Sequence, residues 1–314
     1  MTSYIARRVA SGVVLLFGIS LLAYVLLTLA AGGNTARNIL GDTATPEQIA
    51  QLELELGLDQ PVFVRYGSWL LDALRGDLGR SYYTPQSVTQ AVTDALPVSL
   101  SVLVPVVVVS GVTAFALGLL CAVRRGWLDR AVQVVSTAVD AVPNFLVALF
   151  LATVLGVQLA LFPAVGYVSP QQSVLAWMAT LVLPVTALSL GAVAGIAQQV
   201  RSAAIGVLRQ DYVRTLRSRG LSQRRIVLTS VLRNSSTTGL TMLGLQFVGL
   251  LGGSVVIEQV FALPGLGTLA VTNTTKGDLP LVMGVIVATV AIVIVVNLVV
   301  DLVVAWLNPK ARLR

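Results

Sequence analysis

The chain has 314 residues, of which 56% are hydrophobic and 11% are charged, and its formal net charge is +7. Soluble domains carry about a quarter charged residues, and a soluble core of this size would still need a charged shell, so the composition excludes an ordinary soluble protein and favours a membrane protein. Because there is no histidine and Cys121 is the single cysteine, histidine general bases, imidazole metal ligands and an internal disulfide are also excluded.

Long apolar runs predict six membrane-spanning helices, since a helix needs roughly 20 apolar residues to cross ~30 Å of hydrocarbon. No charge occurs between Ala141 and Val200, a length of two crossings, and a stretch rich in Pro, Gly and Gln at 163–172 divides it. The predicted spans are 9–31, 96–123, 131–157, 173–199, 236–257 and 281–306.

Basic residues gather beside alternate ends of these spans, which predicts the orientation because Lys and Arg near span ends are retained in the cytoplasm. The loop 201–233 carries eight arginines and one acid, whereas the segment 32–95 carries four basic and eight acidic residues. The other basic residues on the predicted inner face are Arg7, Arg8, Arg124, Arg125, Arg130, Lys310, Arg312 and Arg314. Both termini are therefore predicted to be cytoplasmic.

The first apolar run has an alternative interpretation as a cleavable signal peptide, because Arg7 and Arg8 precede it. The apolar core of a signal peptide is about 7 to 15 residues long, and Val9–Ala31 is longer. We therefore interpret this run as a retained membrane span.

The segment 32–95 is the one sizeable aqueous part, and its pattern predicts two short helices. Thr45-Pro46-Glu47-Gln48 is a capping-box sequence, and the helix that it begins should end near Gly57. A second helix should begin at Gln60-Pro61 and end near Gly76, with one apolar face. That face comprises Val62, Tyr66, Trp69, Leu70 and Ala73. We interpret the segment as a cap or docking surface.

A short helix is predicted in the arginine-rich loop between the fourth and fifth spans. Asp211 fits the N-cap and Gly220 the C′ position, and the helix between them should be about 12 Å long. Tyr212, Val213 and Leu216 share one face, and Arg214, Arg217 and Arg219 occupy the rest. These arginines could simply set the topology, but their concentration on a capped, two-faced helix favours docking of another protein.

Several polar or small residues inside the predicted spans have two possible roles. Asp140 lies about ten residues into the third span, where an ionisable group either lines a path or bonds to a neighbouring helix. Gln246 and Asn297, like Gln198 and Gln199, could face a polar passage or join helices, and Asp301 is expected to pair with a basic group. The spacings Gly191-x-x-x-Gly195 and Gly249-x-x-x-Gly253 allow close helix contact.

The basic loop and four further stretches of the chain together resemble one family. The loop DYVRTLRSRGL, from Asp211 to Leu221, resembles the diverged EAA loop of ABC importer permeases, with Arg214-Thr215-Leu216 in place of E-A-A and Gly220 at the glycine. The stretches 56–82, 251–269, 277–284 and 300–312 resemble the same family, although Asn308 and Lys310 stand where Asp and Arg are more usual. The chain is thus similar to the B-type permease subunit of dipeptide, oligopeptide and nickel importers.

This resemblance implies three parts: 1–31 with the first transmembrane helix, 32–95 as an outer, extracytoplasmic helical segment, and 96–314 as a five-helix importer domain that includes the cytoplasmic coupling loop 201–233. It also implies a multi-pass protein of the bacterial cytoplasmic membrane with a second homologous permease, two ABC ATPase subunits, an extracytoplasmic binding protein and a di- or oligopeptide as partners. Contact with the ATPase would involve Asp211, Tyr212, Val213, Arg214, Thr215, Leu216, Arg217, Arg219, Gly220 and Leu221. Asp140, Gln246 and Asn297 are the candidates for the translocation path.

The chain itself is not expected to be an enzyme or to hold a cofactor. Its two lysines, Lys276 and Lys310, do not lie in a G-x-x-x-x-G-K-S/T sequence, so ATP and Mg²⁺ would be bound by the partner ATPases. An ion-gradient-driven secondary transporter is the main alternative, with Asp140 as its one strong candidate carboxylate. A membrane-embedded hydrolase would have no histidine and no G-x-S-x-G sequence. The cargo cannot be deduced from these residues.

Overall fold

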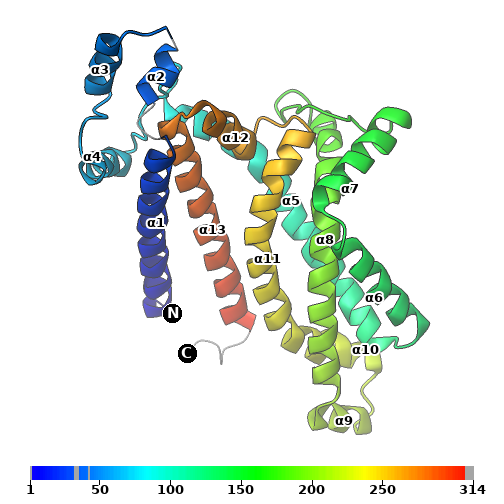
Figure 1. Cartoon of the computed structure of the whole chain (residues 1–314). Coiled ribbons are helices and arrows are strands. Elements are labelled where there is room, and N and C mark those ends of the chain that lie inside the picture. Colours follow the sequence, from blue (N-terminus) through cyan, green and yellow to red (C-terminus); the bar gives the residue numbers. More distant parts are fainter. Residues whose placement is uncertain (1, 32–34, 42, 308–314) are drawn as a thin grey trace. The chain divides into compact units, whose positions relative to one another are not determined.

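The computed structural model describes residues 2–31, 35–41 and 43–307 and is built from helices (Figure 1). The basic C-terminal residues Lys310, Arg312 and Arg314 lie outside this range. The chain divides into two compact units, one consisting mainly of Leu100–Leu263 with the residues from Val295 onward, and the other of Ala6–Ser99 with Pro264–Ile294. Each unit is described by itself below.

Five described helical segments are long and apolar enough to cross a membrane: Ile5–Ala30, Val88–Val123, Val174–Leu208, Gln223–Val260 and Leu279–Leu307. They correspond to helices α1 (Thr2–Ala31), α5 (Val88–Val123), α8 (Val174–Leu208), the continuous run from α10 (Gln223–Ile226) through the π-helical η2 (Val227–Val231) to α11 (Leu232–Val260), and α13 (Leu279–Leu307). Five of the six predicted spans thus have a matching helix.

The prediction of a continuous third span over 131–157 is wrong. Helix α6 (Trp127–Asp140) is followed after a short break by α7 (Asn144–Leu151) and the π-helical η1 (Ala152–Gln158), and the two parts are bent by 94°. Pro143 lies at the break. It has no backbone N–H to donate and disfavours helical backbone at the residue before it. The pair would form a sixth crossing if it is counted as one bent span.

Three of these helices continue beyond the predicted spans into more polar sequence. Helix α5 begins at Val88, ahead of the span predicted from 96, and α8 continues to Leu208, past the predicted end at 199. The helical run that contains the fifth predicted span begins at Gln223, ahead of 236. Most of the arginine-rich loop 201–233 is therefore helix, and the stretch 209–222, which contains α9 (Asp211–Ser218), connects α8 to α10.

In the unit that contains Ala6–Ser99, the segment after α1 folds into α2 (Thr35–Leu40), α3 (Pro46–Glu55) and α4 (Val62–Leu74). The predicted capping box of α3 is confirmed: the Gln48 N–H donates to Thr45 Oγ1 and the Thr45 N–H donates to Gln48 Oε1. The predicted ends of both helices are confirmed as well, since Gly57 and Gly76 have positive φ angles of 64° and 91°.

The predicted apolar face of α4 packs against α1 and α13, with Tyr66 buried and its other members half-buried. Tyr66 and Trp69 pack with Tyr24 of α1 and Met283 of α13, and Val62 and Leu70 join this cluster. The Tyr66 hydroxyl lies 2.9 Å from Ser20 Oγ, which satisfies two polar groups inside an apolar contact.

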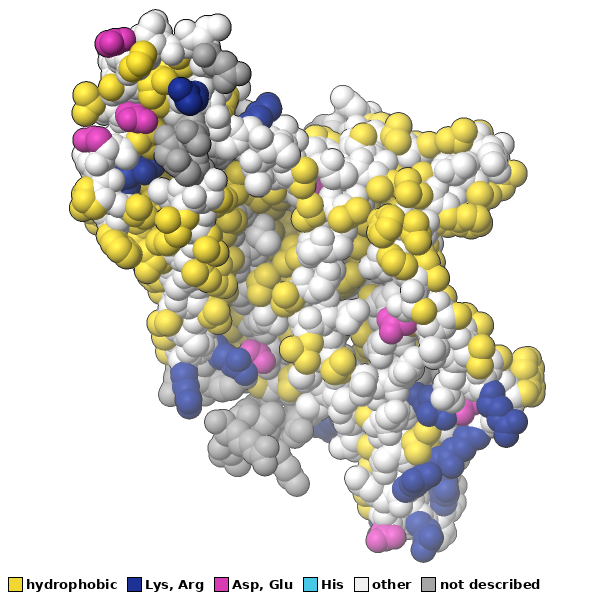
Figure 2. Space-filling model, in the orientation of Figure 1, with side chains coloured by type: hydrophobic (Ala, Val, Ile, Leu, Met, Phe, Trp, Pro, Cys, Tyr) yellow, Lys and Arg dark blue, Asp and Glu magenta, His cyan; other side chains and the backbone are white. Residues whose placement is uncertain are grey.

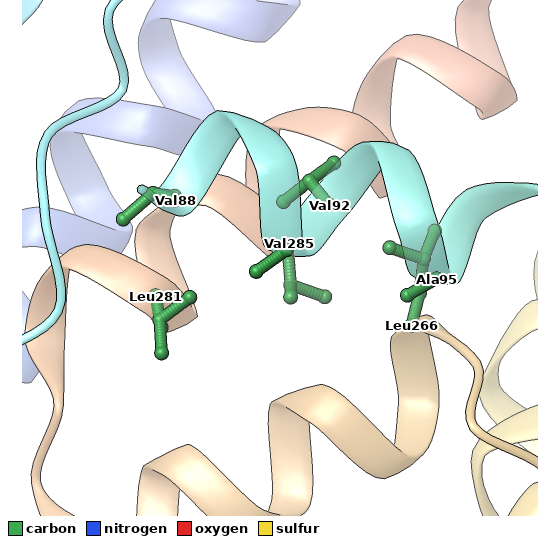
Figure 3. Close-up of a cluster of buried hydrophobic side chains, with 7 residues drawn as sticks. Val88, Val92, Ala95, Leu266, Leu281 and Val285 are labelled. Carbon is green, nitrogen blue, oxygen red and sulfur yellow. The ribbon is translucent and has the colours of Figure 1, made fainter. Parts of the chain in front are cut away.

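The same unit contains helix α12 (Leu266–Lys276), which packs against the first turns of α5. Figure 3 shows Val88, Val92 and Ala95 of α5 directed toward Leu266 of α12 and toward Leu281 and Val285 of α13. The Leu266 N–H donates to Ser99 Oγ at 2.8 Å. The connection between α12 and α13 is fixed by the buried Asp278, whose carboxylate accepts from the Ser81 hydroxyl and from the Tyr82 N–H.

In the unit that contains Leu100–Leu263, α8 is the central helix and contacts α6, α7 and α11. Glycines allow some of these close approaches. A Cβ at Gly118 of α5 would lie 2.8 Å from the Ala197 carbonyl oxygen of α8, and one at Gly239 of α11 would lie 2.4 Å from the ring of Phe115. The core of this unit is therefore built on α8, with helices in backbone-to-side-chain contact.

Candidate functional site

Helix α9 begins one residue earlier than the predicted cap implies. Gln210 is at the N-cap position with extended backbone and makes no side-chain capping bond. The prediction of Asp211 as the N-cap is therefore wrong, because this carboxylate lies in the first turn, where its negative charge is favourable next to the helix N-terminus. The Thr215 hydroxyl donates to the Asp211 carbonyl oxygen, one turn back, at 3.2 Å.

The C-terminus of α9 is a Schellman motif, and the prediction of Gly220 at C′ is confirmed. Gly220 has a φ of +80°. Its N–H donates to the Arg217 carbonyl oxygen at 2.9 Å, and the Leu221 N–H donates to the Leu216 carbonyl oxygen at 3.2 Å. Glycine suits this position because a left-handed backbone is costly for residues with a Cβ.

The apolar face of α9 packs against its own chain. Val213 is fully buried, and Leu216 and Leu221 pack around it. This cluster, which we name the α9 junction, also contains Ala122 of α5, Ala204 and Val207 of α8, Ile226 of α10 and Val231 of η2. The predicted face of Tyr212, Val213 and Leu216 is only partly buried, because Tyr212 is 39% exposed and its hydroxyl accepts from Asn234 Nδ2 at 3.1 Å.

The outer face of α9 is basic. Arg214, Arg217 and Arg219 are exposed together with Thr215. Arg209, Arg224 and Arg225, on either side of α9, are exposed too. Figure 2 shows basic side chains gathered over this end of the unit. The surface that α9 offers to another molecule is therefore cationic and hydrogen-bonding, whereas its apolar residues hold the helix in place.

An ion pair that we did not predict lies next to this junction. Asp129, in the first turn of α6, is buried, and its two carboxylate oxygens accept from Arg201 Nε at 2.5 Å and from Arg201 Nη2 at 2.6 Å. Gln133 Nε2 donates to the same carboxylate at 3.1 Å. The one sequence signal was that Asp129 is the single acid among the basic residues from Arg124 to Arg130. Arg201 was interpreted as part of a loop, but it lies inside α8.

The three candidates for the translocation path are not joined to one another by hydrogen bonds within the described residues. Asp140 is exposed and is the last residue of α6, so it lies at the bend rather than inside a continuous span. Gln246 of α11 and Asn297 of α13 are half-buried. Asn297 Oδ1 lies 3.4 Å from the position that a Cβ would take at Gly244 of α11, so this side chain packs close to that helix.

In each of the two predicted glycine pairs, one glycine allows a close contact, and both of these contacts are with Asn144. Asn144 is the first residue of α7. Its Oδ1 atom lies 2.9 Å from the position that a Cβ would take at Gly191 of α8, and its Nδ2 atom lies 3.7 Å from the corresponding position at Gly253 of α11. Gly195 and Gly249 have no such neighbour within 4 Å. The start of α7 is thus packed between α8 and α11.

Comparison with known proteins assigns the family. The family described as binding-protein-dependent transport system inner membrane component matches residues 114–313, and the N-terminal membrane component of the same kind of system matches residues 1–103. The chain belongs to this family. Its permease type is the one that the resemblance in the sequence implied.

Individual relatives cover the whole chain. The permease is 37% identical over 319 residues to a protein of Brucella abortus (strain 2308) named as a peptide transport system permease, with 99% of each chain covered. It is 33% identical to the glutathione transport system permease protein GsiC of Shigella flexneri serotype 5b, again with 99% of each chain covered. A protein of Sinorhizobium fredii named as a peptide ABC transporter permease is also 33% identical, over 99% of this chain and all of the relative.

A solved structure shares the fold. The MetNI methionine ABC transporter, in an inward-facing conformation, has a chain that aligns with a TM-score of 0.55 and 19% identity and covers 70% of the permease and 97% of that chain. The permease is therefore a transmembrane transport subunit of an ABC importer. The alternative of an ion-gradient-driven secondary transporter is not supported.

Proposed function

We propose that this permease forms part of the translocation path for di- or oligopeptides across the bacterial cytoplasmic membrane. The observation that carries this proposal is full-length similarity to permeases whose names specify peptide or glutathione, which is itself a tripeptide. A second homologous permease would complete the path, and a binding protein would deliver the peptide to the acidic outer segment 32–95.

The proposed topology has six crossings with both termini in the cytoplasm. It is supported by five long apolar helices, by the bent α6–α7 pair as a sixth, and by the concentration of arginines around α9. With this topology the exposed arginines of α9 face the cytosol, and α2, α3 and α4 face the outside.

The proposed coupling role of α9 follows from its two faces. Arg214, Arg217 and Arg219 are exposed and can contact a partner. The buried Val213 fixes α9 to the ends of α5 and α8, so a displacement of α9 also displaces the ends of those helices. Two separate ATPase subunits, which bind ATP and Mg²⁺, would cause this displacement and shift the permease between inward-open and outward-open packings. Moving a 1:99 population to 99:1 needs about 5.5 kcal/mol of differential interaction.

The proposed function is tested by reconstitution. The permease is purified with the proteins that bind it, placed in liposomes with ATP and Mg²⁺ inside, and given a mixed library of di- and tripeptides that includes glutathione outside. We expect ATP-dependent accumulation of a subset of these peptides, measured by mass spectrometry of the liposome contents. Accumulation by the permease alone on an ion gradient, with no nucleotide present, would contradict the proposal.

A further inference from the structure

Helix α6 is bonded to α8 near its start, and the residue that follows the break at its end, Asn144 of α7, also packs against α8. At one end the carboxylate of Asp129 holds the guanidinium of Arg201 through two hydrogen bonds. At the other end the break after Asp140 leads directly to Asn144, which packs against Gly191 of α8. These two attachment points are ten residues apart on α8, roughly 15 Å at 1.5 Å per residue. The segment from α6 to the start of α7 therefore contacts α8 at two positions along its length, at Arg201 and at Gly191.

The Asp129–Arg201 pair also lies next to the part of the protein that holds α9. Ala204 and Val207, which pack against Val213 of α9, come within two turns of Arg201 on α8. The pair is held tightly, since its side chains are only 9% exposed at Asp129 and 23% exposed at Arg201. Two parallel bonds between planar groups fix their relative orientation, which a single contact would not do.

Burying charged groups costs solvation energy that a well-packed apolar contact would not, so a buried ion pair is weak evidence for a contribution to stability alone. Its geometric specificity is the property that an apolar contact lacks. An exposed ion pair offers a comparison: Arg75, at the C-cap of α4, contacts Asp72 at 3.5 Å, and both side chains are largely solvated.

We infer that Asp129 and Arg201 are positioning residues for transport: they make α6 and the cytoplasmic half of α8 move as one body, so that a displacement of α9 reaches the bend at 141–143. The inference rests on the proposed coupling role of α9. Displacement of α9 moves α8 through the α9 junction, and the ion pair passes this movement to α6. Through the break at 141–143, α6 then moves the start of α7 together with α8 and against α11.

We name the contact between Asp129 of α6 and Arg201 of α8 the α6–α8 joint. The protein contains a natural reporter of this joint. Cys121, the single cysteine, lies at the end of α5 next to Ala122 of the α9 junction and is 1% exposed. The Asp129 carboxylate and the Arg201 guanidinium are among the charged groups in the neighbourhood of its thiol. If the joint opens when the ATPases close, a maleimide will reach Cys121 faster.

The test uses variants in the whole transporter complex. Removing one charge would leave the other buried and unpaired and could prevent folding, so the main variant is the double substitution Asp129→Asn with Arg201→Gln, which retains hydrogen-bonding groups and leaves no lone charge. The matched control is Asp72→Asn, which removes the exposed ion pair. Gln133→Ala is a second control, because it removes the third hydrogen bond and keeps the ion pair.

We expect the double variant to reach the membrane and to bind the ATPases as the wild type does, but to accumulate about tenfold less peptide per ATP hydrolysed, within the usual range of coupling energies. The peptides are those that the wild-type complex takes up from the di- and tripeptide library. In the double variant, trapping with ATP and vanadate should raise the rate of alkylation of Cys121 by N-ethylmaleimide about tenfold over the trapped wild type. This ratio is equivalent to a loss of ~1.4 kcal/mol in the stability of the joint. Both controls should match the wild type.

The outcomes separate this inference from the proposed function. If the double variant keeps wild-type uptake per ATP, or if its Cys121 stays as protected in the trapped state as in the wild type, the positioning role is wrong, and the proposed docking of the ATPases by α9 is unaffected. If the wild type itself neither binds ATPase subunits nor hydrolyses ATP with them, the proposed function fails, and the inference fails with it.

Discussion

At the scale of single residues, glycines in the long helices of this permease differ in how closely other atoms approach them. Gly118 and Gly195 both lie inside long helices. A Cβ at Gly118 would meet the Ala197 carbonyl oxygen and Val200 Cβ at 2.8 Å, whereas a Cβ at Gly195 would have no neighbour within 4 Å. One glycine is therefore needed for close packing of α5 on α8, and the other leaves the helix more flexible for no packing gain.

This difference predicts opposite effects of the same substitution. Gly118→Ala should destabilise the permease by ~1–3 kcal/mol, because the contact atoms are backbone and a β-branched side chain that cannot move away easily. Gly195→Ala should stabilise it by up to ~1 kcal/mol through helix propensity. Thermal unfolding of the two variants in one detergent measures both, and equal unfolding temperatures would contradict the packing argument.

At the scale of elements, α9 combines a buried apolar residue with a cationic outer face. The buried Val213 makes the helix part of the unit, while Arg214, Arg217 and Arg219 form no ion pair with an acid in the part of the chain that the structure describes. Electrostatic complementarity to an acidic groove would therefore set the partner of α9 and its rate of association.

Charge reversal of this face should prevent docking without disturbing the fold. Arg214→Glu combined with Arg217→Glu changes exposed side chains only, so membrane insertion should be normal, and retention of the ATPase subunits during purification should fall at least about tenfold. The matched control is Arg75→Glu with Arg80→Glu in the outer segment, which reverses two exposed charges elsewhere. Equal retention by both variants would exclude α9 as the docking element.

At the scale of the whole molecule, the central question is which parts face the cytosol. The proposed topology places α3 outside and α9 inside the membrane-enclosed space. The single native cysteine makes this testable, because Cys121→Ser gives a background free of thiols.

In that background, a cysteine replacing Gln51 of α3 and one replacing Ser218 of α9 both start from exposed positions. A membrane-impermeant maleimide added to intact spheroplasts should label the Gln51→Cys protein and spare the Ser218→Cys protein. Inverted membrane vesicles should give the reverse result. Labelling of both positions from the same side would rule out the six-crossing arrangement.

The sequence by itself determined the features that depend on local interactions and on the solvent. Apolar length gave the long helices, since backbone groups in hydrocarbon must be satisfied within the helix. The Thr45 capping box and the left-handed Gly220 followed from neighbouring residues alone. The family resemblance was likewise carried by contiguous stretches of the chain.

The tertiary structure decided the features that depend on which residues meet across helices. Pro143 stands at the break between α6 and α7 whereas Pro184 is accommodated inside α8, so the presence of a proline alone does not decide where a helix ends. The Asp129–Arg201 pair joins residues 72 positions apart, and no local pattern encodes such a partner. The inward direction of Val213 also depends on distant helices, since Ala122 of α5 and Ala204 and Val207 of α8 help to provide the surface that buries it.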